Sequence, residues 1–442
     1  MDEMTGERIS LGDPLAWLRL DEALRHEPYA PAGLAEPELA IALCHRDGRI
    51  REAALQQAAA YPALLPLVVV RCADWVEQVR ERARELLREL LDVGDVGDVG
   101  TAVALAPLVL LFGRRGRGAF AIELVDEVLR RASREQLAPL FTHPDRAVRR
   151  FVYRLAVEED LLSPAELART AARDTDTVVQ NLCADAALAA VAKTGSYDEV
   201  LEPLLGARNP RARATGVTVL RAAGRAGRAE GFLADRSGVV RACARYVVRQ
   251  GGGDPLALYR AWCLAAEPAP GAVIGLAECG GRDDAALLWP LVSHPGAAVR
   301  ARAVAGLRVL DVGDVRRLLP SLDDPAPGVV REATLALLPS AGLVPDGWLM
   351  ERLAGGARPV RVAAFRLLDA RGGIVRLRAA VAVLDDPDER LRAWGAQVVQ
   401  RWHPEEGMTP GDAEVGELLR RARHLFSAYV LTRRLWEAGL PG

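Results

Sequence analysis

Two short rows of arginine, each with one tyrosine, are the residues of this chain best suited to bind a charged ligand. Arginine can hold a carboxylate or a phosphate through paired N–H groups, and a neighbouring ring can stack on a planar group. The two rows are Arg149, Arg150, Tyr153 and Arg154, and Arg241, Arg245, Tyr246 and Arg249. They predict a groove for an acidic ligand in the central third of the chain. The alternative is a solvated face with one structural arginine per repeat.

No catalytic motif accompanies these rows. The six histidines show no H-E-x-x-H or other paired metal spacing, and the chain has no G-x-S-x-G motif and no Rossmann fingerprint. His143 and His294 stand before proline where sister segments carry aspartate, so we interpret them as helix-capping residues. Five tryptophans, from Trp262 to Trp402, share no register, which favours packing over an aromatic pocket. We expect a protein that is not an enzyme and uses no cofactor or metal.

Two glycine-rich segments are interpreted as loops. Asp92–Gly100 reads DVGDVGDVG and offers too few oxygen ligands for a calcium loop. Gly113–Gly118 reads GRRGRG and lacks the lysine and hydroxyl residue of a phosphate-binding loop. This basic loop is a better candidate for an acidic partner than for a nucleotide.

Cysteine usage and the apolar runs indicate the compartment. The six cysteines show no C-x-x-C spacing and lie in apolar helical contexts, which predicts buried free thiols in a reducing environment. Met1–Ser10 is acidic and polar rather than signal-like. No uncharged run reaches the ~18 residues that a membrane span needs. We therefore expect a cytoplasmic protein without a membrane partner.

The elements that position these residues are helices of a repeated unit. Asp323–Leu338 reads DDPAPGVVREATLALL: Asp324 and Pro325 suit a helix start. The apolar positions then fall at i, i+3, i+4, i+7 and i+8, which predicts an amphipathic helix. A hydrophobic content of 50% with only 5% aromatic residues indicates a core of small aliphatic side chains.

The spacing of this segment predicts the architecture. The Val-Arg step recurs about every 30 residues, a period typical of a solenoid; its clearest copies carry Arg300, Arg331, Arg361 and Arg392. A doubled interval between Arg80 and Arg149 predicts a divergent unit around Gly113–Leu129. The fold class is therefore all-α, an α-solenoid of about ten to twelve stacked helix pairs.

These segments resemble the HEAT-repeat family, including its bacterial lyase-type branch. The resemblance covers Ala40 to Arg401 and rests on Asp-Pro, a short gap, Val-Arg, and then Ala and Leu at helical spacing. It implies antiparallel helix pairs in a right-handed superhelix, with second helices lining a concave face. It also implies that Asp and Arg of the motif tie neighbouring repeats together, with interruptions at Gln180 and Ile274. Relatives include DNA glycosylases and bilin lyases.

We expect three regions along the chain. Residues 1–39 form an N-terminal cap, 40–402 the repeat solenoid, and 403–442 a C-terminal loop and capping helix. Terminal units of a solenoid need an atypical outer face, which is the reason for expecting caps.

The expected function is a non-catalytic protein-interaction scaffold that binds a protein or peptide of acidic character on its concave face. The alternative is nucleic-acid binding through the central Arg/Tyr face, with glycosylase chemistry as in some relatives; a bilin lyase is a further idea from resemblance alone. The pI near 6.4 disfavours nucleic acid. Residues 1–100 also carry 11 Arg against 19 acidic side chains, whereas residues 201–250 carry 10 against 3.

The sequence also suggests a division between structural and binding arginines. We expect Arg331→Ala to lower stability, because Arg331 is assigned to the Asp–Arg ties. We expect Arg150→Glu with Arg245→Glu to weaken partner binding and leave stability nearly unchanged.

Overall fold

The computed structural model describes residues 13–26, 36–91, 99–113, 118–405 and 408–441, and within them every regular element is helical. Of the two predicted loops, Asp92–Gly100 and Gly113–Gly118, residues 92–98 and 114–117 lie outside the described residues. Val99 and Gly100 are not in a loop, because helix α6 begins at Val99. The chain forms two compact units, residues 1–219 and 220–442, whose boundary falls inside helix α13. Each unit is described by itself.

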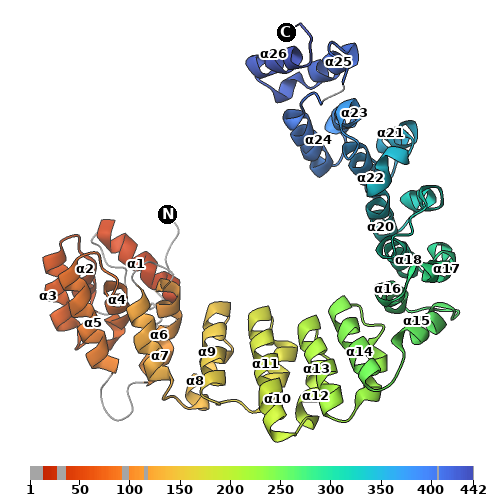
Figure 1. The fold of residues 1–442 in the computed structure, drawn as a ribbon. Coiled ribbons are helices and arrows are strands. Elements are labelled where there is room, and N and C mark those ends of the chain that lie inside the picture. The colour runs from red at the N-terminus through yellow and green to blue at the C-terminus, as the bar shows by residue number, and fades with distance from the viewer. Residues whose placement is uncertain (1–12, 27–35, 92–98, 114–117, 406–407, 442) are drawn as a thin grey trace. The chain divides into compact units, whose positions relative to one another are not determined.

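The first unit consists of short helices that follow one another in pairs (Figure 1). Its helices are α1 (Pro14–His26), α2 (Pro37–Cys44), α3 (Gly48–Ala58), α4 (Leu65–Arg71), α5 (Glu77–Leu91), α6 (Val99–Phe112), α7 (Ala119–Leu129), α8 (Arg134–Phe141), α9 (Arg146–Glu158), α10 (Pro164–Arg173), α11 (Thr177–Thr194), α12 (Asp198–Leu205) and α13 (Pro210–Ala222). The pair α6–α7 is the divergent unit that the doubled interval predicted.

The second unit continues the pattern, but several first helices are shortened to 3-10 turns. Its elements include η2 (Ala226–Phe232), α14 (Gly238–Gln250), α15 (Pro255–Cys263), α16 (Pro270–Cys279), α17 (Ala285–Leu288), η4 (Pro290–Ser293), α18 (Ala297–Val309), α19 (Val315–Leu318), η5 (Leu319–Asp323), α20 (Pro327–Leu337), α21 (Asp346–Gly355), α22 (Arg358–Asp369), α23 (Gly373–Ala382), α24 (Glu389–Arg401), α25 (Ala413–Arg421) and α26 (Ala428–Glu437).

Neighbouring repeats stack through like helices. Second helices pack on second helices, as α3 does on α5, α9 on α11, α18 on α20 and α20 on α22. First helices pack on first helices, as α4 does on α6 and α10 on α12. The all-α solenoid of stacked antiparallel pairs is therefore confirmed, with twelve pairs from α2–α3 to α23–α24 among the described residues.

The core consists of small aliphatic side chains, as the composition predicted. In the first unit one buried cluster runs from Trp17 to Leu155 and a second from Leu167 to Ala212. The β-branched run Val68–Val70 lies in α4, whose residues are all buried, so burial overrides its strand propensity. The described cysteines are free thiols. Burial raises the pKa of Cys263 to about 11, which leaves this thiol protonated and unreactive.

The predicted region boundaries lie close to helix ends. Helix α2 begins at Pro37, three residues before the predicted start of the solenoid, and α24 ends at Arg401. Residues 403–442 carry two helices, α25 and α26, where a single capping helix was predicted, because the chain turns at Arg423–Leu425. The cap functions of the flanking regions stay a prediction. Among the described residues, no helix combines the length and apolar character needed to cross a bilayer.

Candidate functional site

Arginine–aspartate ion pairs connect successive repeats, and we call each such pair a rung. In a rung, an arginine in the first turns of a second helix donates to the aspartate that precedes the next second helix. The same guanidinium also donates to a carbonyl at the start of its own loop, such as His294 O at 3.0 Å from Arg300. The rungs are Arg51–Asp74 (2.7 Å), Arg149–Asp174 (3.2 Å), Arg300–Asp324 (2.7 Å) and Arg361–Asp386 (2.7 Å).

Each rung aspartate also shapes the start of the next helix. Oδ1 of Asp324 accepts the N–H of Ala326 at 2.8 Å, two residues further on. The Arg300 guanidinium lowers the pKa of Asp324 below its usual range, mainly through their hydrogen bonds. His143 and His294 replace aspartate in this role, because Nδ1 of each accepts the N–H two residues later, at 3.1 and 3.0 Å. Both histidines thus take the position and the loop hydrogen bond of the aspartate, but the N–H they accept belongs to the N-cap residue, Asp145 or Gly296, so neither caps the helix directly.

The rungs are interrupted where the sequence predicted. Gln180 keeps only the bond to its own loop, donating to Asp174 O at 2.5 Å. Ile274 is buried and has no group to donate. Its helix instead supplies Glu278, which accepts Nε of Arg241 at 3.1 Å and so replaces the missing loop aspartate.

The first predicted row lies on helix α9 and is tied to both neighbouring second helices. Arg149 forms a rung, Arg150 bonds Asp176 at 2.7 Å, and Arg154 bonds Asp126 at 3.1 Å. The Arg150 hydrogen bond is the main reason that the pKa of Asp176 falls to about 2, so this pair is ionised throughout the physiological range.

The second predicted row lies on helix α14, in the other unit. Arg241 and Arg245 both bond Glu278 of α16, the latter at 2.7 Å. Tyr246 is half exposed and Arg249 is exposed on the same helix. Five arginines across the two rows thus connect adjacent helices, which favours the structural alternative for these five.

The assignment of Arg331 to a rung is wrong. The rung arginines Arg51, Arg149 and Arg300 each follow a loop histidine by six residues, whereas Arg331 follows Asp324 by seven. Val330 therefore occupies the buried rung position, and the Arg331 side chain is 71% exposed beside Glu332. The facing loop carries Gly355 and Gly356 where other loops carry the aspartate, so this rung lacks both members.

From these contacts we expect the opposite of the sequence-based prediction: Arg245→Glu should lower stability and Arg331→Ala should leave it nearly unchanged. Arg331→Ala should change the free energy of unfolding by less than about 0.5 kcal/mol, as for other exposed positions. Arg245→Glu should lower it by about 2 kcal/mol, because Arg245 is 11% exposed and the variant places a second carboxylate beside Glu278. Urea unfolding of the two single variants checks both values, and equal losses would contradict this assignment.

A groove beside the first row has the features of a binding site. It encloses about 510 Å³ between first helices α8 and α10, and Tyr153 of α9 lines it. The Tyr153 ring lies 4.9 Å from the Phe141 ring, tilted by 55°. Burial raises the pKa of Tyr153, so the phenol stays neutral and can donate a hydrogen bond. The remaining lining residues are Arg134, Leu162, Glu166, Arg169, Thr170, Arg173 and Asp174.

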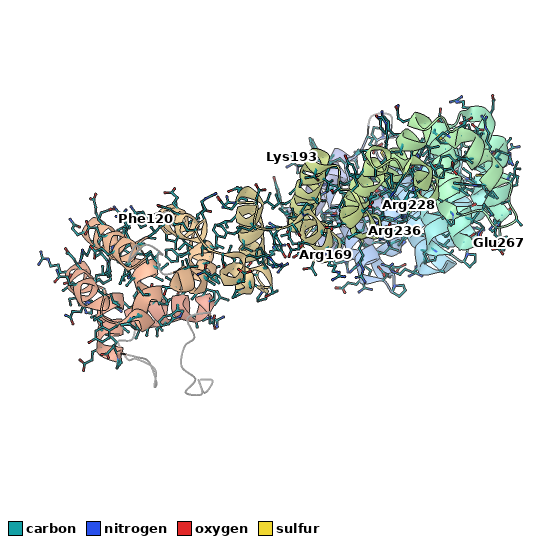
Figure 2. All side chains as sticks on the ribbon, turned by 90° about the horizontal axis from the view of Figure 1, so that it is seen from below. Phe120, Arg169, Lys193, Arg228, Arg236 and Glu267 are labelled. Atoms are coloured by element: carbon teal, nitrogen blue, oxygen red, sulfur yellow. The ribbon has the colours of Figure 1, made fainter. Side chains whose placement is uncertain are left out.

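Two arginines of the α8–α10 groove, Arg169 and Arg173, take no part in the ion pairs of its described residues. Glu166 pairs with Arg134, and Asp174 pairs with Arg149. Arg169 (labelled in Figure 2) and Arg173 are both exposed, and neither has a carboxylate within ion-pair distance among the described residues. The two lie four residues apart on α10 and so share one face. A neutral donor, an aromatic wall and two available guanidinium groups suit a carboxylate attached to an apolar or planar body.

Most residues of this groove lie on or beside first helices α8 and α10, whereas the sequence-based prediction considered only the exposed residues of second helices. Of the predicted residues, Tyr153 alone lines it. The available signal was the i, i+4 spacing of Arg169 and Arg173 on a helix whose opposite face, with Leu167, Ala168 and Ala171, is apolar and buried. Partner binding by the eight predicted residues stays a prediction.

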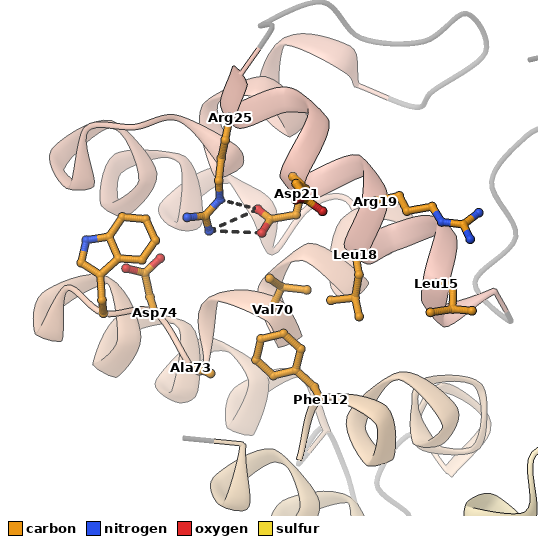
Figure 3. Close-up of a pocket in the computed structure, with 11 residues that line it drawn as sticks. Leu15, Leu18, Arg19, Asp21, Arg25, Val70, Ala73, Asp74 and Phe112 are labelled. Carbon is orange, nitrogen blue, oxygen red and sulfur yellow. Dashed lines mark hydrogen bonds and ion pairs between the residues drawn. The ribbon is translucent and has the colours of Figure 1, made fainter. Parts of the chain in front are cut away.

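A larger hollow of about 760 Å³ lies between α1, α4 and α6, as Figure 3 shows. Under it, Arg71 bonds both Asp21 of α1 and Asp74, while Asp21 also pairs with Arg25 at 3.1 Å. Burial lowers the pKa of Arg71. Trp75 is covered by Arg25 and Arg51, each about 4.5 Å from its ring centre. This network attaches α1 to the first repeats, so we interpret it as structural.

The tryptophans make separate packing contacts rather than one pocket. Trp289 lies under Arg317, Trp348 under Arg352, and Trp394 meets Phe365 edge-on. In the described part of the chain, no group of three or more His, Cys, Asp or Glu side chains is arranged to hold a metal ion.

Comparison with known proteins yields only distant structural likenesses. No family model matches the chain, and no curated protein matches it. It is similar to a structure of microtubule polymerases with tumor overexpressed gene domain arrays, which recruit tubulin (12% identity, 81% of this chain and 98% of that chain, TM-score 0.27). It is also similar to a structure of Kap95p with RanGDP, at 11% identity over 96% of this chain and 66% of that chain, with a TM-score of 0.37. A structure of Kap121p is similar at 13% identity over 87% of this chain and 45% of that chain, with a TM-score of 0.26. These values are too low to transfer the function of those proteins to this chain.

Proposed function

We propose that this chain is a non-catalytic protein-interaction scaffold and that the α8–α10 groove holds an acidic segment of a partner protein. The observation that carries the proposal is the pair Arg169 and Arg173, two exposed cations without a carboxylate partner among the described residues, beside the contacting rings of Phe141 and Tyr153. Guanidinium groups next to an aromatic wall bind carboxylates through paired N–H bonds and an apolar body by contact.

The helical repeat supports a scaffold because its surface is built for contact rather than chemistry. Stacked pairs expose long rows of side chains without enclosing a dry pocket, and binding surfaces of this kind are typical of solenoids. The α8–α10 groove lies between first helices, and Tyr153 alone of its lining comes from a second helix, α9. Binding on the concave face formed by second helices is therefore kept as a separate part of the proposal.

Nucleic acid is the second candidate, and the ion pairs disfavour it. Five of the predicted arginines already bond carboxylates of adjacent helices, which reduces the charge that a phosphate backbone could neutralise. Glu166 and Asp174 also line the α8–α10 groove and would repel a continuous row of phosphates. The formal net charge of −2 gives no overall basic footprint.

Capture from a nuclease-treated lysate of the source cells tests the proposal. Three baits are compared: the tagged full chain, its R169E/R173E variant and a control R49E/R146E variant. The control changes the net charge by the same amount, at exposed arginines that do not line the groove. We expect a defined protein partner whose recovery falls at least tenfold with R169E/R173E and stays within twofold with the control. Equal recovery by all three baits, or partners lost on nuclease treatment, would contradict the proposal.

A further inference from the structure

The second unit contains a smaller groove between second helices α20 and α22. It encloses about 260 Å³. This volume is below the range of small-molecule pockets, about 300–1,000 Å³, and suits one apolar side chain of a larger partner. Its floor is apolar and its rim carries three arginines. The lining residues are Pro327, Val330, Arg331, Thr334, Arg358, Pro359, Val362, Ala363 and Arg366.

The missing rung accounts for this α20–α22 groove. Where other repeats place an arginine and an aspartate, α20 has Val330 and the facing loop has Gly355 and Gly356. A Cβ at Gly355, six residues before Arg361, meets nothing within 4 Å, whereas one at Gly356 would lie 2.6 Å from Arg352 O. The rung is therefore missing because this loop supplies no carboxylate side chain. The second-helix surface is therefore apolar at this point instead of being closed by an ion pair.

The rim of the α20–α22 groove has more positive than negative charge. Arg358 pairs with Asp388, and Arg331 shares Glu332 with Arg308, which lies 3.6 Å away. Arg366 is exposed and has no carboxylate within ion-pair distance among the described residues. No acidic side chain lines the groove. The charge that complements this rim is a carboxylate on the partner.

We infer that the α20–α22 groove is a second docking site, for an acidic amphipathic helix of a partner protein. One leucine-like side chain of the partner fills the floor at Val330, Val362 and Ala363. Glutamates one turn to either side bond Arg331 and Arg366, since side chains three or four residues apart share a helix face. The inference rests on the proposed scaffold function but uses different residues, in the other unit.

A synthetic peptide tests this site without knowledge of the natural partner. The probe is a fluorescein-labelled helical peptide with photo-leucine at its centre and glutamates at i±3 and i±4. A second peptide replaces the glutamates with glutamine, and single-stranded DNA of similar net charge is the third ligand. Fluorescence anisotropy with the full chain gives Kd, and mass spectrometry of the photo-crosslinked product locates the peptide.

We expect the glutamate peptide to crosslink within α20 or α22. R331E/R366E should weaken it at least tenfold, whereas R316E/R401E, an equal charge change at exposed arginines, should alter Kd less than twofold. R169E/R173E should also leave the α20–α22 crosslink intact. A result that disproves binding at the α8–α10 groove can therefore be told apart from one that disproves binding at the α20–α22 groove. No binding, crosslinks elsewhere, or equal affinity for the glutamine peptide or the DNA would overturn the inference.

Discussion

Asp74→Ala is expected to lower the free energy of unfolding by about 3–5 kcal/mol, the range for removing one partner of a buried ion pair. Asp74 and its partners Arg51 and Arg71 have side chains that are 0% exposed. The carboxylate accepts from Arg51 at 2.7 and 3.0 Å and from Arg71 at 3.3 Å. Its removal leaves the buried Arg51 guanidinium with the backbone carbonyls of His45 and Arg46, and the buried Arg71 guanidinium with Asp21 of α1.

Urea unfolding followed by circular dichroism measures this loss, and Asp324→Ala is the matched control. Asp324 forms the same rung with Arg300, but both side chains are more than 10% exposed, so water can replace the lost bonds. Its loss should be clearly smaller. Equal losses in the two variants, or a loss below about 1 kcal/mol for Asp74→Ala, would show that the buried network of Asp74 with Arg51 and Arg71 does not stabilise the first repeats.

Gly271→Ala should destabilise the second unit by about 3 kcal/mol, at the upper end for overpacked sites. Gly271 is the second residue of α16, and a Cβ there would lie 1.9 Å from Ala234 O and 2.5 Å from Ala234 C. Both neighbours are backbone atoms, so no side-chain rotation relieves the overlap. Helix α16 would have to move away from the turn that follows η2.

Gly328→Ala is the control for this prediction, since the two segments read nearly alike. Gly328 is also the second residue of its helix, α20, after the same Pro, but a Cβ there meets nothing within 4 Å. Alanine should be neutral or stabilise the protein by up to about 1 kcal/mol, because it lowers the entropy of the unfolded chain. Urea unfolding of both variants is the measurement, and similar shifts of the same sign would contradict the packing described for α16.

The repeat architecture could be predicted because it depends on local patterns. The i, i+3, i+4 stripe and the loop aspartate recur in phase, and each repeat packs mainly on its neighbours. The rungs follow from the same motif, and Gln180 and Ile274 interrupt them as expected. Helix α20 begins three residues after Asp324, as α18 does after His294. Val330 therefore takes the rung position, and Arg331 stands one residue beyond it. One residue turns a side chain by about 100° around a helix, which was enough to mislead the assignment of Arg331.

The candidate sites could be predicted only in part, since they depend on which charges remain unpaired. The sequence identifies Arg150 and Arg245 as exposed candidates, but their partners Asp176 and Glu278 lie 26 and 33 residues away and come into contact only on folding. Arg169 and Arg173 look like ordinary surface residues in the sequence. Their significance depends on Tyr153 and Phe141, which reach the same groove from two other helices.

Hydrogen–deuterium exchange of the full chain, with and without the captured partner, tests the central claim most directly. If the α8–α10 groove holds an acidic segment, the partner should slow exchange in residues 134–141 and 164–173, and R169E/R173E should abolish this protection. A partner that binds tightly while these two helices exchange at the same rate as in the free chain would contradict the account.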